Sequence, residues 1–198
     1  MTQTLQPPAI CVFLGSSFGT DPAYRDAAEQ FGQCLAARNL GLVYGGGSVG
    51  LMGVLADAVL AADGRVIGVL PEALMAREVG HLGLTELIIE PSMHARKATM
   101  ASRCGAFAVL PGGIGTLEEM FEVATWIQLE ILTKPIGILN VQGFYDPLLV
   151  FLDQLVDKGF LKTVHRDILI VESDPERLLE RLLSTRTPAA GKWIPERS

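Results

Sequence analysis

The chain has 198 residues, of which 49% are hydrophobic and 19% charged, and its 16 basic and 22 acidic residues give a net charge of -6. A chain of this length buries about 70% of the surface that its unfolded form exposes, so we expect one domain that folds without disulfides or a structural metal. The acidic balance argues against binding to nucleic acids or to membrane surfaces, because no broad cationic field is present to attract phosphates.

The cysteines and the apolar runs indicate where the protein resides. Cys11, Cys34 and Cys104 lie among apolar neighbours without Cys-x-x-Cys spacing, so we expect reduced thiols. No apolar run approaches the roughly 18 residues that a membrane span requires, and residues 1–9 have no basic segment before the first apolar run. These features predict a cytoplasmic protein.

Seven short aliphatic runs are predicted to be strands. They are apolar along their whole length, which is typical of strands covered on both faces, and stretches of helical period separate them. This alternation predicts a doubly wound α/β fold, a Rossmann-like single domain with a mostly parallel sheet and helices on both faces. The expected strands cover residues 10–14, 42–44, 66–70, 87–89, 107–110, 136–139 and 168–171.

Helix starts are also predicted by the sequence. Asp21, Asp146 and Asp174 each precede a proline, which is typical of an N-cap carboxylate with proline at the first helical position. Ser92 is expected to cap a helix that runs to Arg103.

Between two strands, residues 71–84 are polar and contain glycines, so we expect a surface loop. The domain is expected to cover residues 10–184, between an N-terminal arm, 1–9, and a mobile C-terminal tail, 185–198.

The first glycine cluster, residues 44–53, leaves a predicted strand and enters a helix expected at 54–62. It contains the frame Gly45-x-Gly47-x-x-Gly50, in which glycines let the backbone approach a phosphate while the helix start supplies N–H donors. The alternative is that tight turns need glycine without any ligand.

A dinucleotide-dependent enzyme is a further alternative. Glu72 follows Gly50 by 22 residues, near the spacing of an acid that binds ribose. However, no second domain is available for a substrate, and none of Tyr24, Tyr44 and Tyr145 is followed by a lysine four residues later, the pairing typical of short-chain dehydrogenases. A P-loop frame is also absent from the sequence.

The second glycine cluster, residues 110–119, again joins an apolar run to a predicted helix. The carboxyl ends of parallel strands meet at one edge of a sheet, so both clusters are expected to face one crevice that suits a small phosphorylated ligand. Within it, Thr116 and Glu119 also have the spacing of a capping box, which would serve helix stability alone.

Arg96 and Lys97 are adjacent cations in an otherwise acidic chain, near the start of the helix that precedes the second cluster. A solvated charged face is the simple alternative, but their position favours anion binding. His81, His94 and His165 show no metal-ligand spacing.

Five motifs together resemble one family. They are GSS at 15–17, YGGGSVGLMG at 44–53, PEALMAREV at 71–79, MHARKATM at 93–100 and PGGIGTLEE at 111–119. The chain is similar, over about residues 10–183, to the Lonely Guy family, cytokinin riboside 5′-monophosphate phosphoribohydrolases formerly labelled possible lysine decarboxylases. The resemblance implies a homodimer that hydrolyses the N-glycosidic bond of AMP or an N6-substituted AMP, without cofactor or metal.

The resemblance also assigns roles to residues. It places the catalytic pair on Arg96 and Glu119, and one departure from the family is Gly105, where an aspartate is common. A carboxylate at 119 suits the chemistry, because cleavage of the bond builds positive charge on the sugar. The expected substrate-binding residues are Ser17, Gly45, Gly46, Glu78, Lys97, Gly112, Gly113, Ile114, Gly115, Thr116, Leu117, Glu118 and Thr125.

Two other function classes are alternatives to a hydrolase. A pyridoxal-phosphate decarboxylase needs a Schiff-base lysine and an acid partner, usually in a much larger chain. A non-catalytic nucleotide carrier of the same fold is the more serious alternative, although it has no chemical need for both Arg96 and Glu119.

The helix expected at 120–129 is apolar on more than one face, so we expect it in a two-fold dimer interface near the site.

Overall fold

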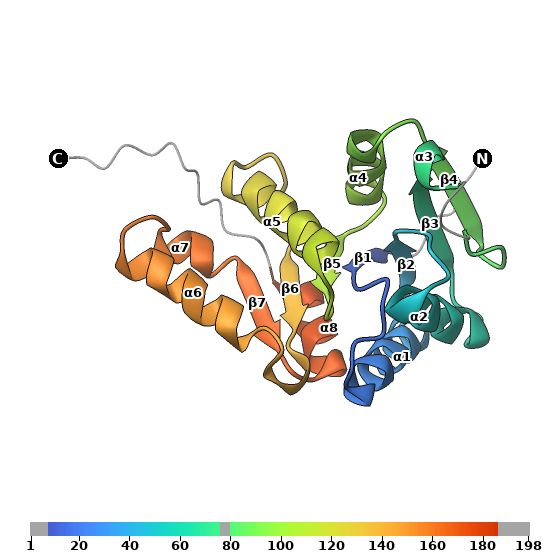
Figure 1. Ribbon diagram of the computed structural model, residues 1–198, viewed down its shortest axis with the longest axis horizontal. Helices are drawn as coiled ribbons and strands as arrows, with labels where there is room; N and C mark the ends of the chain where they lie inside the picture. Colours follow the sequence, from blue (N-terminus) through green and yellow to red (C-terminus); the bar gives the residue numbers. More distant parts are fainter. Residues whose placement is uncertain (1–7, 76–79, 186–198) are drawn as a thin grey trace.

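A seven-stranded parallel sheet lies at the centre of the molecule, between two layers of helices (Figure 1). The computed structural model describes residues 8–75 and 80–185. The strand order β4-β3-β2-β1-β5-β6-β7 reverses direction at β1, and every pair of neighbouring strands is parallel. The strands are β1 Ala9–Phe13, β2 Gly41–Tyr44, β3 Val66–Pro71, β4 Glu86–Glu90, β5 Ala106–Val109, β6 Ile136–Leu139 and β7 Leu169–Glu172.

All seven predicted strands are therefore confirmed, with bounds that shift by at most one residue. The expectation of full burial fails for the two edge strands of the sheet: the residues of β4 are half-buried or exposed, and the last two residues of β7 are half-buried. The other strands from β1 to β6 are buried throughout, as expected for strands covered on both faces.

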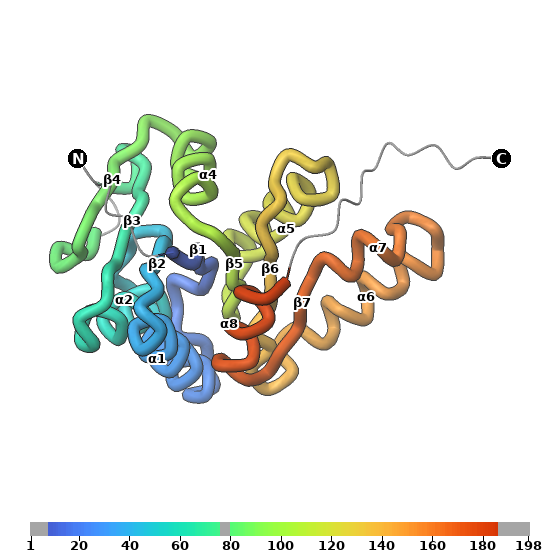
Figure 2. The backbone as a smooth tube through the Cα atoms, turned by 180° about the vertical axis from the view of Figure 1, so that it is seen from behind, coloured from blue at the N-terminus to red at the C-terminus, as the bar shows by residue number. Residues whose placement is uncertain are grey.

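Two hydrophobic clusters separate the faces of the sheet. Alternate residues of β1 belong to different clusters: Ile10 and Val12 pack on one side, Cys11 and Phe13 on the other. The first cluster is covered by α1 (Pro22–Ala37), α2 (Gly50–Ala61) and α8 (Pro175–Ser184), and α8 is seen from its own side in Figure 2. The second cluster is covered by α4 (Met93–Ser102), α5 (Ile114–Gln128) and α6 (Asp146–Asp157).

Three of the four predicted N-caps are confirmed. The side chains of Asp21, Ser92 and Asp174 accept hydrogen bonds from backbone N–H groups in the first turns of α1, α4 and α8, at 2.9, 3.1 and 2.9 Å. The prediction for Asp146 is wrong, since this residue is already the first of α6. Its carboxylate instead accepts a hydrogen bond from the Asn140 side chain at 2.6 Å.

The surface loop predicted at 71–84 contains more regular structure than expected. β3 extends to Pro71, and a single helical turn, α3, follows at Glu72–Met75. Two further short elements, the 3-10 helix η1 (Val141–Gly143) and α7 (Thr163–Arg166), flank α6. The N-terminal arm at 1–9 lies outside the described residues except for its last two, and the tail from 186 onward lies outside them entirely, so both stay predictions. No described helix is long and apolar enough to cross a bilayer.

Candidate functional site

A cavity of about 270 Å³ opens at the carboxyl ends of the strands, where the strand order reverses between β1 and β5. Ligands of open α/β sheets bind at such a reversal, because the loops that follow the two central strands diverge there. We call it the Arg96 cavity. It is lined by Leu14, Gly15, Ser16, Gly45, Met52, Leu74, Met93, Arg96, Gly113, Ile114, Gly115, Thr116, Glu118 and Glu119.

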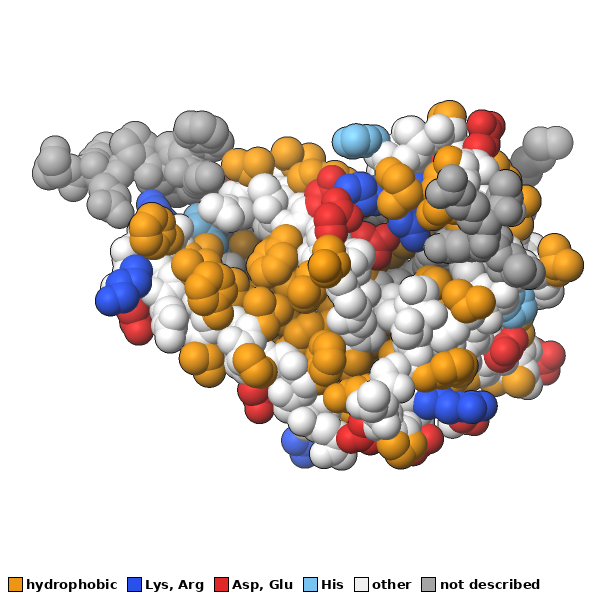
Figure 3. Space-filling model, viewed as in Figure 1, with side chains coloured by type: hydrophobic (Ala, Val, Ile, Leu, Met, Phe, Trp, Pro, Cys, Tyr) orange, Lys and Arg blue, Asp and Glu red, His pale blue; other side chains and the backbone are white. Residues whose placement is uncertain are grey.

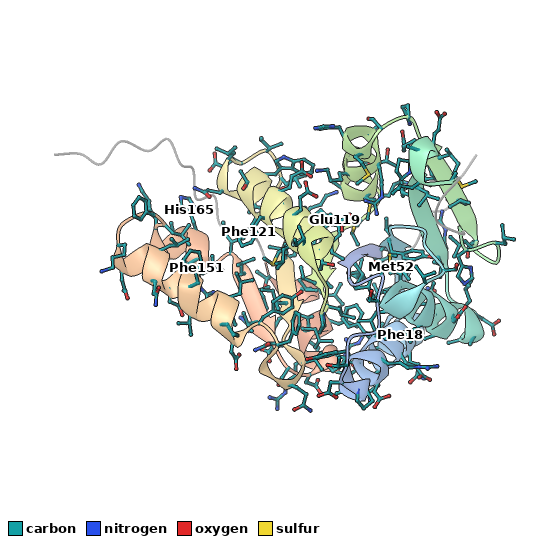
Figure 4. All side chains as sticks on the ribbon, in the orientation of Figure 1. Phe18, Met52, Glu119, Phe121, Phe151 and His165 are labelled. Carbon is teal, nitrogen blue, oxygen red and sulfur yellow. The ribbon has the colours of Figure 1, made fainter. Side chains whose placement is uncertain are left out.

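Arg96 on α4 is held in place by two other elements. Its Nε donates a hydrogen bond to the carbonyl oxygen of Val69 in β3 at 2.9 Å, and its Nη1 lies 2.8 Å from Oε1 of Glu119 on α5. Only 8% of Arg96 is exposed, so this charge has one fixed orientation. Figure 4 shows Glu119 on the side of α5 that faces α4. The predicted catalytic pair is therefore brought together as a buried ion pair.

Burial raises the pKa of Glu119, although the neighbouring Arg96 opposes the shift. A carboxyl group with a raised pKa exchanges protons more readily near neutral pH, which is the property required of a general acid or base. The alternative capping-box role is wrong. The N-cap of α5 is Gly113, so Thr116 already lies inside the first turn and Glu119 in the second.

The start of α5 forms one wall of the cavity. No side chain forms a hydrogen bond at its N-cap, and Gly113, Ile114 and Gly115 are exposed on the cavity side. The first N–H groups of a helix attract anions, since they lack partners within the helix and lie at the positive end of its dipole. The second glycine cluster thus offers a phosphate site beside the Arg96–Glu119 pair.

Lys97 lies next to the cavity without lining it. Its ammonium group is 2.6 Å from Glu118 and 2.9 Å from Glu122, both on α5. Burial would lower the pKa of Lys97, but the hydrogen bonds to these two carboxylates outweigh it and raise the pKa. Figure 3 shows acidic and basic side chains gathered between α4 and α5. Lys97 is therefore a charged, engaged group in the ligand-free protein.

The first glycine cluster contributes less to the cavity than predicted. Gly45 lines it, whereas Gly46 and Gly50 have φ angles of 80° and 61°, a conformation that favours glycine. The carbonyl of Gly46 accepts a hydrogen bond from the backbone N–H of His81 at 3.1 Å. For Gly46 and Gly50 the simple alternative, a turn that needs glycine, is the better account. The helix predicted at 54–62 begins earlier, at Gly50.

Several predicted substrate-binding residues lie elsewhere. Ser17 and Gly112 line a neighbouring cavity, and Leu117 packs against the hydrophobic core. The Thr125 hydroxyl donates to the carbonyl of Phe121 at 2.7 Å, on the exposed side of α5, about 9 Å along the helix from Glu119. Glu78 lies outside the described residues.

The sequence did not single out three apolar residues of the cavity wall, Met52, Leu74 and Met93, which come from three different elements. Met52 and Met93 stand inside motifs quoted above, but their orientation depends on the packing of α2 and α4. Gly105, the departure from the family, is exposed and precedes β5. It lies at the opposite edge of the sheet from the cavity, so it leaves the site unchanged.

Together, the strand reversal, the helix start and the buried ion pair define an α/β protein that binds an anionic ligand and has a carboxylate placed to act on it. The family model described as "Possible lysine decarboxylase" matches residues 52–182. A protein of Oryza sativa subsp. japonica, named "Probable cytokinin riboside 5'-monophosphate phosphoribohydrolase", is 50% identical over 87% of this chain and 71% of its own length. An Arabidopsis thaliana protein named as such a phosphoribohydrolase is 49% identical, over 87% and 81%. The chain therefore belongs to the Lonely Guy family.

Solved structures confirm the fold. The molybdenum cofactor binding protein of Rippkaea orientalis superposes with a TM-score of 0.69 at 22% identity, over 91% of this chain and 98% of the other. The molybdenum cofactor carrier protein of Chlamydomonas reinhardtii gives 0.68, also at 22%, over 90% and 99%. At this level of identity the likeness concerns the fold alone.

Proposed function

We propose that this protein hydrolyses the N-glycosidic bond of a nucleoside 5′-monophosphate, AMP or an N6-substituted AMP, to the free base and ribose 5-phosphate. The observation that carries the proposal is the buried Arg96–Glu119 pair, fixed at 2.8 Å beside the exposed start of α5. In a nucleoside 5′-monophosphate, one ribose separates the phosphate from the scissile bond. The phosphate can therefore lie at the start of α5 while the bond lies beside Glu119.

Glu119 is the group that acts on the sugar. As the base departs, positive charge grows on the ribose, and a carboxylate held nearby stabilises it without reorganisation. The same carboxylate orients the attacking water and accepts its proton, a role that suits its raised pKa. Arg96 keeps the Glu119 carboxylate in one position, because its Nε bond to Val69 prevents it from following the substrate.

The 5′-phosphate binds at the start of α5, where Gly113, Ile114 and Gly115 present backbone N–H groups. Recognition of the phosphate orients the sugar against Glu119, so binding energy from a non-reacting group accelerates the chemical step. The base then lies against Met52, Leu74 and Met93. This apolar wall would accommodate a hydrophobic N6 substituent on the base.

The two alternative functions fit less well. A Schiff-base lysine must be available as a neutral amine with a lowered pKa, whereas the pKa of Lys97 is raised and two carboxylates engage it. Lys97 is therefore unsuited to hold pyridoxal phosphate, despite the older family label. A carrier protein would need the α5 start for an anion, but it would gain nothing from a buried carboxylate beside it.

A homodimer is part of the proposal. On α5, Thr116, Met120, Val123 and Ile127 are buried against the sheet, while other apolar side chains remain outside. Figure 3 shows hydrophobic side chains gathered over α5 and α6. We define the α5–α6 apolar face as Phe121, Ile131, Val150 and Phe151, which are 39%, 64%, 56% and 53% exposed. A second copy related by a two-fold axis would cover it and bring its Thr125 region near the site.

The proposal also includes a cytoplasmic location, which is supported by the three free cysteines, two of them buried.

The decisive experiment on function incubates the purified protein with AMP, N6-isopentenyl-AMP and adenosine, and measures free base by chromatography. We expect release of base from both nucleotides, and from adenosine about 100-fold more slowly, because the phosphate contacts are lost. Equal rates on adenosine and AMP would contradict the proposed phosphate site.

A further inference from the structure

A second cavity, of about 290 Å³, lies beside the Arg96 cavity. The two share Gly15, Ser16 and Gly113, so they meet at the start of α5. The backbone N–H of Gly15 donates to the carbonyl of Pro111 at 3.1 Å, which ties the two loops of this shared wall together. We call it the aromatic cavity, after the Phe18, Tyr24 and Phe144 side chains that line it with Leu51. Hydrolysis of a mononucleotide leaves these side chains without a role.

The aromatic side chains are held by contacts of their own. The ring of Phe144 meets Tyr24 edge to face at 5.5 Å between centroids and Tyr145 at 4.8 Å. Tyr145 is buried, and its hydroxyl donates to the carbonyl of Leu110 at 2.8 Å, so it anchors this group to the end of β5. The cavity is thus formed before any ligand arrives.

Two rings of the cavity are accessible to a ligand. Phe18, labelled in Figure 4, is 50% exposed, and Phe144 is 39% exposed. The guanidinium of Arg25 lies 5.9 Å from the centroid of the Phe18 ring, within the range of a cation–π contact. An exposed aromatic surface with a cation at its rim suits a planar, electron-rich ring that has a negatively charged group attached.

The proposed orientation of the nucleotide indicates which part of a larger ligand the aromatic cavity would hold. With the base and ribose in the Arg96 cavity and the 5′-phosphate at the start of α5, whatever extends beyond that phosphate passes the shared wall into the aromatic cavity. We propose that the protein binds dinucleotides, in which a nucleoside 5′-diphosphate occupies the Arg96 cavity and the shared wall while a second aromatic ring occupies the aromatic cavity. This inference rests on the proposed function for the orientation of the first nucleotide.

The first glycine cluster supports this inference. Gly45, the first glycine of its Gly45-x-Gly47-x-x-Gly50 frame, lines the Arg96 cavity, while Gly50 serves the turn into α2. The frame ends at the start of α2, and the next residue, Leu51, lines the aromatic cavity. The first cluster therefore reaches both cavities, through Gly45 and Leu51, and the second cluster does so through Gly113. Binding alone is proposed, with no redox step.

The test compares diadenosine diphosphate with ADP-ribose, which is the same molecule without the second base. Both are titrated calorimetrically into the wild-type protein, and into Glu119→Gln protein if either is cleaved. We expect the Kd of diadenosine diphosphate to be lower by about ten-fold, the gain from one well-packed aromatic ring. The double variant Phe18→Ala/Phe144→Ala should abolish this difference and leave the Kd of AMP within about two-fold, since AMP has no second ring.

The matched control is Phe160→Ala, which removes an equally large ring that is 84% exposed and lines neither cavity. It should keep the ten-fold difference. Equal Kd values of the two ligands in the wild type would overturn the inference, and so would a difference that survives the double variant. A double variant that becomes monomeric would assign the cavity to a second copy instead. A wild-type protein that does not hydrolyse AMP but still binds diadenosine diphosphate ten-fold more tightly than ADP-ribose would overturn the proposed function and leave the dinucleotide site standing.

Discussion

The guanidinium of Arg96 occupies the space at the floor of the Arg96 cavity that a side chain at Gly45 would fill, since a Cβ atom on Gly45 would overlap the Nη2 atom of Arg96. The absence of a side chain at position 45 therefore fixes where the guanidinium lies. Arg96 in turn fixes Glu119 through the 2.8 Å ion pair. A glycine at the end of β2 thus positions a carboxylate on α5, seven elements further along the chain.

Gly45→Ala should displace Arg96 and misplace Glu119. We expect kcat/KM for AMP to fall by about 10- to 100-fold, because a shift of about 1 Å in a reacting group costs that much. The measurement is steady-state hydrolysis with circular dichroism as the check on folding. Gly105→Ala is the matched control, since its added Cβ would meet only the carbonyl oxygen of Ala9 at 3.9 Å, and it should keep wild-type activity. Equal losses in both variants would contradict the positioning role.

Glu119→Gln should separate charge from packing. The amide oxygen of glutamine can still accept the hydrogen bond from Arg96, but the variant leaves the Arg96 charge without its counter-charge. We therefore expect the unfolding free energy to fall by no more than about 3 to 5 kcal/mol. Turnover should fall by about 100-fold or more while AMP still binds, because the amide carries no negative charge and accepts no proton from water. Single-turnover kinetics and calorimetry measure the two effects.

Glu29→Gln on α1 is the control, as an exposed glutamate far from the cavity. It should leave turnover unchanged. Near-normal turnover of folded Glu119→Gln protein would return Glu119 to a structural role, and the assignment of the catalytic pair would be lost with it.

The raised pKa of Glu119 predicts how activity depends on pH. Activity needs the ionised carboxylate, so kcat/KM should decline on acidification with a midpoint above the usual glutamate value of about 4.3. The contribution of Glu119 to folding stability depends on pH in the opposite direction, since it increases on acidification. Because folding raises this pKa, the contribution of Glu119 to stability is present below its unfolded pKa and is lost as the pH rises through the folded one. A pH–rate profile whose acid limb persists in Glu119→Gln would assign the limb to another group.

Much of the fold was predictable because local chemistry and tertiary packing agree there. The apolar runs gave seven strands, and Asp21, Ser92 and Asp174 cap helices as their sequence context predicts. Asp146 shows the limit of such patterns. The chain before it places the Asn140 side chain within reach of its carboxylate, and this tertiary contact replaces the cap.

The site was predictable in its charged residues and unpredictable in its apolar walls. Arg96 and Glu119 were predictable because they stand in the motifs MHARKATM and PGGIGTLEE that carry the family resemblance, whereas Leu74 and Phe144 resemble core residues. Whether such a residue faces a cavity depends on the packing of distant elements. The capping-box alternative for Thr116 failed for a related reason, since the N-cap residue is Gly113 and takes no side-chain cap, and the helix starts at Ile114.

The α5–α6 apolar face predicts the assembly. Phe151→Asp places a charge at the centre of a surface that a second copy is proposed to cover, and burial of an unpaired charge is costly. We expect this variant to be monomeric by light scattering at micromolar concentration, where we expect the wild type to be a dimer. Leu82→Asp is the control, because Leu82 is 93% exposed and lies between β3 and β4, away from this face. A wild type that is monomeric and active would contradict the dimer.

Gly115 gives the sharpest test of the phosphate site. A Cβ atom at this position would have no protein atom within 4 Å, so it would enter the open space of the Arg96 cavity in front of the α5 start. Gly115→Ala should therefore fold normally, and alanine in place of glycine inside a helix should even add up to about 1 kcal/mol of stability. Its methyl group, however, would stand where the 5′-phosphate is proposed to bind.

We expect the KM for AMP to rise by about ten-fold or more, while the slow hydrolysis of adenosine, which carries no phosphate, stays within about two-fold of the wild type. The selectivity for AMP over adenosine should thus collapse in a protein with a higher melting temperature. Gly41→Ala, at the opposite end of β2, is the control for the substitution itself, since its methyl group would meet Ala9 and no part of the cavity. If Gly115→Ala keeps the wild-type preference for AMP, the phosphate does not bind at the start of α5, and the orientation of the substrate against Glu119 must be reversed.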